Sequence, residues 1–351
     1  MTLEVSTAQI DAVAEQVQVH KFGGSSLADA YCYRRVARIV TEYAGASDLV
    51  VVSAAGDTTN RILAIIDAKQ EGDETGDFGM AEVLLKQLEK YQQGLITDLL
   101  SGEILTQVLA ASQHDFSRWW NWLAGGEVIE NRPELLSYGE LWSARLLAAL
   151  LKQQGIRADY IDARRFLVAD DAPEPLIRVD VSRAGLLNRI APHAGTRFIV
   201  TGFICSDPDG RSLILGRNGS DYSATLVGSL IDSKQVTIWK DVAGVYSADP
   251  RKVERVVSLP ILDWREAEEL ARLGSPVLHP RTFQPVNRDR MVIAVRSSLK
   301  VENQQTRIGQ YEDTEPTGKV LTALSEVVLF RVDLRDAKLI EAFEELELTP
   351  L

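Results

Sequence analysis

The sequence predicts an α/β protein, built as a three-layer αβα sandwich around a mostly parallel sheet. Short β-rich runs, such as Val17–Phe22 and Leu49–Ser53, alternate with long segments of helical periodicity. This alternation is typical of βαβ units and therefore of a parallel sheet covered by helices. Each of the two runs also ends in a turn of small residues that opens a helix.

The middle of the chain is predicted to form a helical subdomain that packs on this sheet. Ala68–Leu123 has helical periodicity, interrupted by Gly-rich and acidic turns. Its Trp119, Trp120 and Trp122 are expected to be packing residues and not a stacking platform. The alternation then resumes, with strands expected near Ala158, Phe198, Leu213 and Gln235 and helices over Glu140–Gln154 and after Tyr222 and Trp264.

Composition and charge narrow the function classes. The 351 residues are 45% hydrophobic and 25% charged, enough for a large core, and the net charge of −12 argues against a nucleic-acid partner. Residues 1–19 lack the basic and apolar regions of a signal peptide, and apolar runs are shorter than the roughly 20 residues that span a bilayer. We therefore expect a cytoplasmic protein without a membrane partner. Cys32 and Cys205 are expected to be free thiols, and no metal site is predicted.

The first chemical motif is Lys21-Phe22-Gly23-Gly24-Ser25, at the junction of a predicted strand and helix. Adjacent glycines let backbone amides approach a phosphate, and Lys21 adds a positive charge. The spacing matches neither a Walker A loop nor a dinucleotide fingerprint. Taken alone, the motif is equally compatible with an ordinary tight turn.

Two further motifs contain polar groups suited to a small zwitterion. The stretch from Ser53 to Thr59 again follows a β-rich run, and its alternative interpretation is a helix cap formed by Asp57 or Thr58. Glu140 and Arg145 are predicted to bracket the first turn of a helix, where they could bind the ammonium and carboxylate of an amino acid. A pair of solvated surface charges is the simpler explanation for them.

The last two motifs are glycine-containing loops at strand ends. In Leu215–Ala224, Arg217 and backbone amides suit an anion, and Asp221 could orient Lys21 or a magnesium-bound phosphate. Trp239–Arg251 follows a strand and is rich in polar and turn residues. Such a loop can hold a nucleotide base and ribose beside an aromatic side chain.

Taken together and in this order, the five motifs resemble the aspartokinase family, within the amino-acid kinase fold, from about Val19 to Arg307. The similarity is greatest to the kinase portion of the methionine-branch bifunctional aspartokinase/homoserine dehydrogenases, through HKFGGSSLAD, LGRNGSDYSA and DVAGVYSADPRKV. The resemblance implies an aspartate kinase that uses ATP and Mg²⁺ to convert L-aspartate to 4-phospho-L-aspartate. That reaction opens the route to lysine, threonine and methionine.

The resemblance also assigns roles to residues. Lys21 and Asp221 would be catalytic, and Ser53, Thr59, Glu140 and Arg217 would bind aspartate. The ATP site would be formed by Lys21, Gly23, Gly24, Ser25, Lys240, Asp241, Tyr246 and Arg251. Residues 1–315 would be the catalytic domain and 316–351 an incomplete ACT-like α+β regulatory segment, and a homodimer is expected.

Two positions depart from the family pattern. Pro276 stands where a nucleotide-contacting Lys is common, so His279 nearby is interpreted as a structural histidine at a helix start. Asp57 occupies a position where a smaller residue is expected, and its carboxylate either repels aspartate or caps the helix. Two alternatives therefore stay open: a kinase for another small carboxylate or a nucleoside monophosphate, and a catalytically impaired nucleotide- or amino-acid-sensing module.

Overall fold

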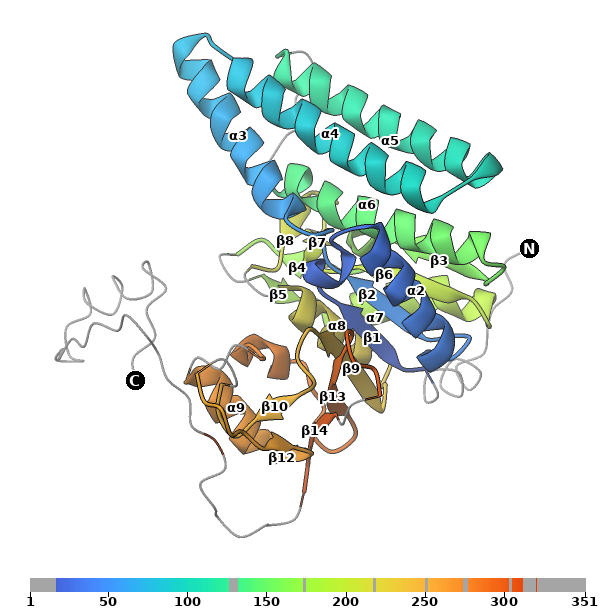
Figure 1. The fold of residues 1–351 in the computed structure, drawn as a ribbon, viewed down its shortest axis with the longest axis vertical. Helices are drawn as coiled ribbons and strands as arrows, with labels where there is room; N and C mark the ends of the chain where they lie inside the picture. The colour runs from blue at the N-terminus through green and yellow to red at the C-terminus, as the bar shows by residue number, and fades with distance from the viewer. Residues whose placement is uncertain are drawn as a thin grey trace, which may run out of the picture.

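An eight-stranded sheet forms the centre of the protein (Figure 1). The computed structural model describes residues 17–125, 132–172, 175–216, 219–249, 252–273, 277–302, 305–311 and 320. The strand order is β12-β14-β13-β9-β1-β2-β6-β3, and every neighbouring pair is parallel except β13 with β14. The strands of this sheet are β1 (Val19–Phe22), β2 (Leu49–Val52), β3 (Ala158–Ile161), β6 (Arg197–Thr201), β9 (Gln235–Lys240), β12 (Ile261–Asp263), β13 (Val292–Ser297) and β14 (Thr306–Gly309).

Short two-stranded sheets lie outside the main sheet, in the segments that connect its strands. Each is a two-stranded antiparallel pair. They are β4 (Ala169–Asp170) with β5 (Leu176–Ile177), β7 (Ile204–Ser206) with β8 (Ser212–Ile214), and β10 (Val245–Tyr246) with β11 (Ser258–Leu259).

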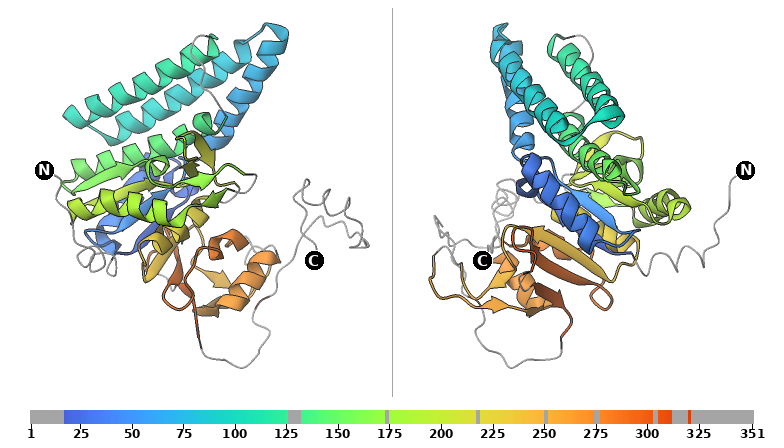
Figure 2. Two further views of the ribbon diagram at one scale, coloured as in Figure 1. Left: turned by 180° about the vertical axis from the view of Figure 1, so that it is seen from behind. Right: turned by 45° about the vertical axis from the view of Figure 1, so that its right-hand side comes forward.

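Helices cover both faces of the sheet, because the central strands are apolar on both sides. In β2, Val50 and Val52 pack with α2 and α6, whereas Leu49 and Val51 pack with α7 and α8. Seen from behind, α7 lies in front of the sheet, on the face opposite α2 (Figure 2). The helices of the two layers are α2 (Ala30–Tyr43), α6 (Arg132–Gln153), α7 (Val179–Ile190), α8 (Gly219–Leu230) and α9 (Trp264–Arg272), with short 3₁₀ turns η1 (Gly24–Leu27), η2 (Ala163–Arg165), η3 (Ala191–His193) and η4 (Pro280–Phe283).

The helical subdomain consists of α3 (Thr58–Thr75), α4 (Gly79–Leu99) and α5 (Gly102–Leu123), which lie beyond α6 (Figure 1). Its core is aromatic. Trp119 is fully buried, and its ring contacts Trp122 and Tyr138 edge-on at centroid distances of 5.8 Å. The interpretation of these tryptophans as packing residues is therefore confirmed.

Most of the predicted architecture is confirmed, including the three layers and the mostly parallel sheet. One boundary was wrong, since the helix predicted from Glu140 begins at Arg132. The strands β12, β13 and β14 of the sheet were not predicted. The predicted ACT-like segment lies outside the described residues. No helix in the described part of the chain is long and apolar enough to cross a membrane.

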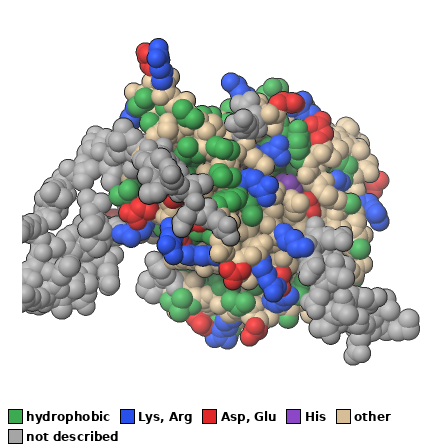
Figure 3. Space-filling model, turned by 90° about the horizontal axis from the view of Figure 1, so that it is seen from below, with side chains coloured by type: hydrophobic (Ala, Val, Ile, Leu, Met, Phe, Trp, Pro, Cys, Tyr) green, Lys and Arg blue, Asp and Glu red, His purple; other side chains and the backbone are tan. Residues whose placement is uncertain are grey.

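The surface seen from below is mixed in character. Lys and Arg side chains stand there in several separate groups, with acidic and apolar side chains between them (Figure 3). On this face, the described residues do not form one continuous basic tract.

The packing of Trp119 gives a stability prediction. Trp119→Ala removes a fully buried indole and leaves a cavity, so we expect a loss of about 3–5 kcal/mol in the free energy of unfolding. Trp120→Ala is the matched control, because Trp120 is only half-buried, and about 1 kcal/mol is expected. Urea unfolding followed by circular dichroism compares the two. Equal losses would contradict the packing role of Trp119.

Candidate active site

The candidate site lies where five neighbouring parallel strands end. In open α/β sheets, ligands bind in the crevice outside the carboxyl ends of the strands. Here the loops that leave these ends contain most of the polar motifs of the sequence. The last residues of the five strands are Ser297 (β13), Lys240 (β9), Phe22 (β1), Val52 (β2) and Thr201 (β6).

A cluster of three charges occupies the middle of this edge, with Lys21 and Asp221 buried and Lys240 half-buried. Asp221 Oδ1 lies 2.5 Å from Lys21 Nζ, and Asp221 Oδ2 lies 3.0 Å from Lys240 Nζ. Burial alone would raise the pKa of Asp221, but the two lysine charges outweigh it and lower the pKa to about 2. The carboxylate is therefore ionised throughout the physiological range. Asp221 is therefore placed to orient Lys21, which is one of the two roles that the sequence suggests for it.

Strand register and a helix start bring these three residues together. β1 and β9 are adjacent and parallel, with Phe22 opposite Trp239, so Lys21 and Lys240 project from neighbouring strand ends. Asp221 belongs to the first turn of α8, which packs against both β1 and β9. The resulting cluster contains two cations and one anion, so it carries one surplus positive charge.

The loop after β1, residues 23–28 (the β1 turn), does not open an α-helix directly. Gly24 begins the 3₁₀ turn η1, and α2 starts only at Ala30, where Asp29 caps it by accepting a hydrogen bond from Cys32 N. The helix expected after β1 therefore begins as a 3₁₀ turn at Gly24, and the α-helix follows a few residues later. Lys21 Nζ nevertheless lies 3.5 Å from the position of a Cβ on Gly23, so the amine and the glycine turn are adjacent.

Gly24 is required by close contact with the loop after β2, residues 53–58 (the β2 turn). A Cβ on Gly24 would lie 2.8 Å from Ala54 O and 2.9 Å from Gly56 O, distances that real Cβ atoms do not show. Gly56 N also donates to Gly24 O at 3.0 Å. The β1 and β2 turns are consequently held against each other by their backbones.

Glu140 reaches the β2 turn from α6 and is almost completely buried. Its Oε1 accepts a hydrogen bond from Ala54 N at 3.1 Å, while its Oε2 is buried without a hydrogen-bond partner among the described residues. Gly139 makes this approach possible, since a Cβ there would lie 2.7 Å from Ala54 Cβ. Burial raises the pKa of Glu140 to about 8. A buried carboxyl with an unpartnered oxygen is an unusual feature that favours a ligand-binding role.

Neither of the capping roles considered for the β2 turn is present. Asp57 is the residue before α3, but its side chain accepts from Asn60 Nδ2 and caps no backbone amide. Thr58 Oγ1 instead donates to Ala55 O at 2.6 Å. Ser53 and Thr59 are both half-buried near this turn, where they are available to a ligand.

Arg145 does not join Glu140 as predicted. Both residues lie well inside α6, and Arg145 Nη1 donates to Asp115 Oδ2 of α5 at 2.7 Å. Trp142 Nε1 donates to the same oxygen at 3.0 Å. Arg145 therefore links α6 to α5 of the subdomain. The pairing of Glu140 with Arg145 suggested by the sequence was misleading, because Asp115 is the residue that binds Arg145.

The predicted nucleotide loop is described only in part. Asp241 is exposed and Tyr246 is half-buried in β10, and no hydrogen bond or ion pair of the described residues links either side chain to Lys21 or Asp221. Their assignment stays a prediction. Ser25 is exposed at the start of the β1 turn. Three predicted or questioned positions, Arg217, Arg251 and Pro276, lie outside the described residues.

His279 is structural, as predicted. Its Nδ1 accepts a hydrogen bond from Arg281 N at 3.3 Å, which caps η4. Burial lowers the pKa of His279, and the nearby charge of Arg281 lowers it further. Neutral imidazole is therefore the favoured form, and it is already used as a cap.

Sequence reasoning missed two loops at the same edge. Gly202 and Phe203 follow β6, and Phe203 has a positive φ of 67°, a strained conformation that is common at functional sites. Ser298 follows β13, and its Oγ donates to Lys240 O at 3.0 Å. The signal that could have found them is the one used for Lys21: small or hydroxyl residues directly after a β-branched run.

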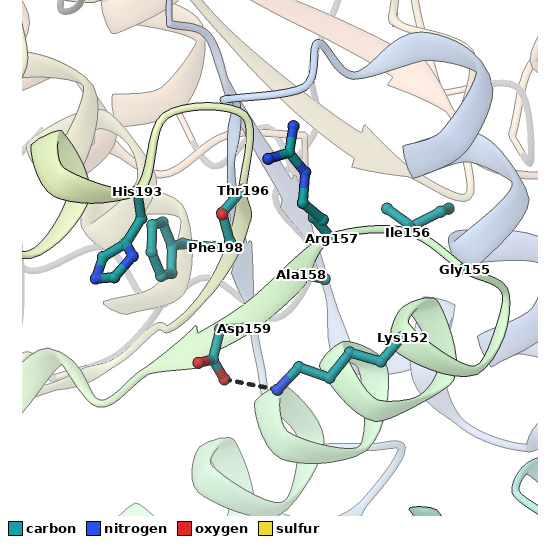
Figure 4. A pocket seen from close by; sticks show the side chains of 9 residues that line it. All are labelled: Lys152, Gly155, Ile156, Arg157, Ala158, Asp159, His193, Thr196 and Phe198. Atoms are coloured by element: carbon teal, nitrogen blue, oxygen red, sulfur yellow. Dashed lines mark hydrogen bonds and ion pairs between the residues drawn. The ribbon is translucent and has the colours of Figure 1, made fainter.

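A cavity of about 470 Å³ lies at the opposite, amino-terminal edge of β3 and β6 (Figure 4). Its polar groups do not converge. Lys152 Nζ is paired with Asp159 at 3.1 Å, and Arg157 points away from both (Figure 4). This cavity therefore lacks the converging charges of the site at the carboxyl edge.

Comparison with known proteins decides the family. The sequence model of the amino acid kinase family matches residues 16–297. The chain belongs to the amino acid kinase family. This assignment agrees with the resemblance noted in the five motifs and with the carboxyl-edge position of the site.

Relatives within the family are aspartokinases by name. Bifunctional aspartokinase/homoserine dehydrogenase 2 of Escherichia coli (strain K12) is 43% identical over 318 residues, 91% of this chain and 39% of that protein. The chain thus spans well under half of that relative's length. E. coli aspartokinase III in complex with lysine and aspartate superposes with a TM-score of 0.73 at 28% identity, covering 85% of this chain and 66% of that one. Its complex with aspartate and ADP gives a TM-score of 0.67 at 26% identity, with the same coverage.

The buried Glu140 makes stability depend on pH. Its pKa of about 8 in the folded protein exceeds the ordinary value of 4.5, so the folded state holds a proton that the unfolded state releases. Between these two pH values, this group lowers the free energy of unfolding by about 1.4 kcal/mol per pH unit as pH rises. Glu140→Gln should remove that slope.

Urea unfolding at pH 5.5 and 7.5 measures this effect. Parent and Glu140→Gln are compared at both pH values, and the parent is expected to lose about 2–3 kcal/mol relative to the variant. Parallel pH dependences would show that Glu140 is ionised in the folded protein.

Proposed function

We propose that the protein is an aspartate kinase, which transfers the γ-phosphoryl group of MgATP to the side-chain carboxylate of L-aspartate. Two neighbouring features carry the proposal. One is the Lys21–Asp221–Lys240 cluster, and the other is the buried Glu140, which contacts the β2 turn and has one carboxylate oxygen without a hydrogen-bond partner among the described residues. One part suits a phosphate and the other an ammonium group. The names of the relatives, and the aspartate and ADP bound in the aspartokinase III complexes, support the same substrates.

The chemistry needs no general base. A side-chain carboxylate is already ionised at pH 7, so its oxygen attacks the γ-phosphorus directly while the bond to the bridging oxygen of ADP breaks. The site must neutralise charge and hold the two groups in line. The surplus positive charge on the Lys21–Asp221–Lys240 cluster provides such neutralisation. His279 is not needed as a base, in agreement with its role as a cap.

Aspartate would be bound at the β2 turn. Glu140 would accept the α-ammonium through Oε2, and Ser53 and Thr59 would contribute hydroxyl groups. Arg217 would bind a carboxylate of the substrate. The nearest competing substrates are other small carboxylates, and the ammonium partner favours a free amino acid over an N-acetylated one.

ATP would bind across β1 and β9. Lys21 and Lys240 would contact phosphate oxygens, with the amides of Gly23, Gly24 and Ser25 near them. Asp241, Tyr246 and Arg251 would line the remainder of the nucleotide site. Within the described residues, no group of three or more His, Cys, Asp or Glu is placed to hold a metal. Mg²⁺ would therefore arrive with the nucleotide, bound largely by phosphate oxygens and water.

The wider setting follows from the same proposal. Phosphorylation of aspartate is the first step toward lysine, threonine and methionine, and the reaction would take place in the cytoplasm. Residues 316–351 would begin an ACT-like regulatory segment, and the protein would act as a homodimer.

The test is ADP release with MgATP and a panel of L-aspartate, L-glutamate, N-acetyl-L-glutamate and UMP, with hydroxylamine present to trap an acyl phosphate. The proposal expects ADP and hydroxamate with L-aspartate alone. ADP release with another acceptor would assign a different kinase. Nucleotide binding without turnover of any acceptor would support the sensing module.

Lys21 is expected to act on turnover and not on aspartate binding. Lys21→Met keeps much of the volume but removes the charge next to the transferred group, so kcat should fall at least about 100-fold. The KM for aspartate should change little, because Lys21 lies in β1 and not at the β2 turn, where aspartate would bind. Lys86→Met, at an exposed position of α4, is the control. Near-normal turnover of Lys21→Met would contradict the catalytic assignment.

The affinity for aspartate is expected to increase with pH. Glu140 holds a proton below its pKa of about 8 and must lose it to bind an ammonium group. The KM for aspartate should therefore fall by up to about tenfold per unit as pH rises from 6 toward 8. Glu140→Gln should have a high KM that no longer depends on pH in this range. A pH-independent KM in the parent would contradict this role.

A further inference from the structure

Helix α4 of the helical subdomain contacts both turns of the site through two consecutive side chains, Tyr91 and Gln92. Sequence reasoning assigned no chemistry to this helix. The first of its contacts joins α4 to the β1 turn, where Tyr91 Oη donates to Ala28 O at 2.8 Å. Burial raises the pKa of Tyr91, so the hydroxyl keeps the proton that it donates.

The same hydroxyl also packs against the β2 turn. Gly56 has a positive φ of 52°, and a Cβ there would lie 3.0 Å from Tyr91 Oη and 3.3 Å from Ala28 Cα. Tyr91, Ala28 and Gly56 therefore meet at one point. This point is next to the Gly56 N to Gly24 O hydrogen bond that joins the two turns.

Gln92 makes the second contact, at the end of the β2 turn. Its Nε2 donates to Thr58 Oγ1 at 3.3 Å, and Thr58 Oγ1 donates onward to Ala55 O. Gln92 and Thr58 are 2% and 0% exposed, so this short chain of hydrogen bonds is shielded from water. Buried polar links of this kind favour one arrangement of the groups that they join.

Tyr91 also marks the boundary between two parts of the core. Its ring packs against the cluster formed by α2, α6 and the sheet, and against the cluster inside the subdomain. The guanidinium of Arg61, from α3, lies 4.7 Å from the ring centroid. Tyr91 therefore contacts the subdomain, the layer of α2 and α6, and the β1 turn at the same time.

We infer that Tyr91 and Gln92 are positioning residues, which hold the β1 and β2 turns at the separation that phosphoryl transfer needs. This inference rests on the proposed function. Among the described residues, the side-chain hydrogen bonds of Tyr91 and Gln92 go to Ala28 and Thr58, and not to Lys21, Asp221 or Glu140. Their loss leaves the groups proposed to bind each ligand in place but loosens the alignment of one ligand with the other. Small errors in alignment slow a transfer reaction much more than they weaken binding.

Kinetics separate this role from a structural one. Tyr91→Phe and Gln92→Leu should each lower kcat about five- to tenfold, with KM for ATP and aspartate within about twofold of the parent. Melting temperatures should stay within about 3 °C. Tyr31→Phe and Gln93→Leu are matched controls, since Tyr31 is 71% exposed and the side chain of Gln93 donates to Glu89 of its own helix. Both controls should keep the parent kcat.

Hydrogen exchange read by mass spectrometry tests the positioning without relying on activity. Peptides that cover residues 23–28 and 53–58 should exchange faster in Tyr91→Phe and Gln92→Leu than in the parent and the two controls. The inference is overturned if these peptides exchange at the parent rate in both variants. It is also overturned if the parent is active and both variants keep its kcat. If the parent itself releases no ADP with aspartate, the proposed function fails and the exchange result decides the positioning role alone.

Discussion

The ion pairs of Asp221 with Lys21 and Lys240 are the constraint on which the site depends. Burying the charges of Lys21 and Asp221 is costly unless they are paired, and here one carboxylate pairs with Lys21 and with the half-buried Lys240. The pairing requires that β1 and β9 be adjacent and parallel and that α8 begin directly behind them. The charge cluster therefore depends on the arrangement of β1, β9 and α8 in the fold. The unbalanced positive charge that remains suits the strongly anionic phosphates of a nucleotide.

A second constraint is the close approach of backbones around that cluster. Gly24 and Gly139 each stand where a Cβ would collide with the β2 turn, so both glycines permit close packing against this turn. Glu140 is brought by this packing into a place where burial keeps it protonated. An oxygen without a hydrogen-bond partner and a raised pKa are the properties expected of a carboxyl group that binds a cationic ligand. The helical subdomain completes the arrangement by contacting both turns from the outside.

Much of this could be predicted from the sequence because strand ends are visible as β-branched runs followed by glycines and hydroxyl residues. Lys21 and Asp221 were found in loops of this kind, whereas Lys240 was assigned through the family resemblance, and the alternation of strands and helices indicated the layers. Arg145 was misjudged because a sequence shows an acid and a base four or five positions apart but not the Asp115 that binds the base. Tyr91 and Gln92 carried no signal at all, because their role arises only from the packing of α4 against two distant turns. The same limit applies to Phe203, whose backbone strain is invisible before folding.

The most direct test of the account is single-turnover transfer of phosphate from [γ-³²P]ATP to L-aspartate by Asp221→Asn, with ATP binding measured by calorimetry. The variant keeps the shape of the side chain but no longer balances the two lysines. The account predicts that ATP still binds while transfer slows at least about 100-fold, because the lysines lose their fixed positions. Transfer at the parent rate would contradict the claim that this charge cluster is the centre of the reaction.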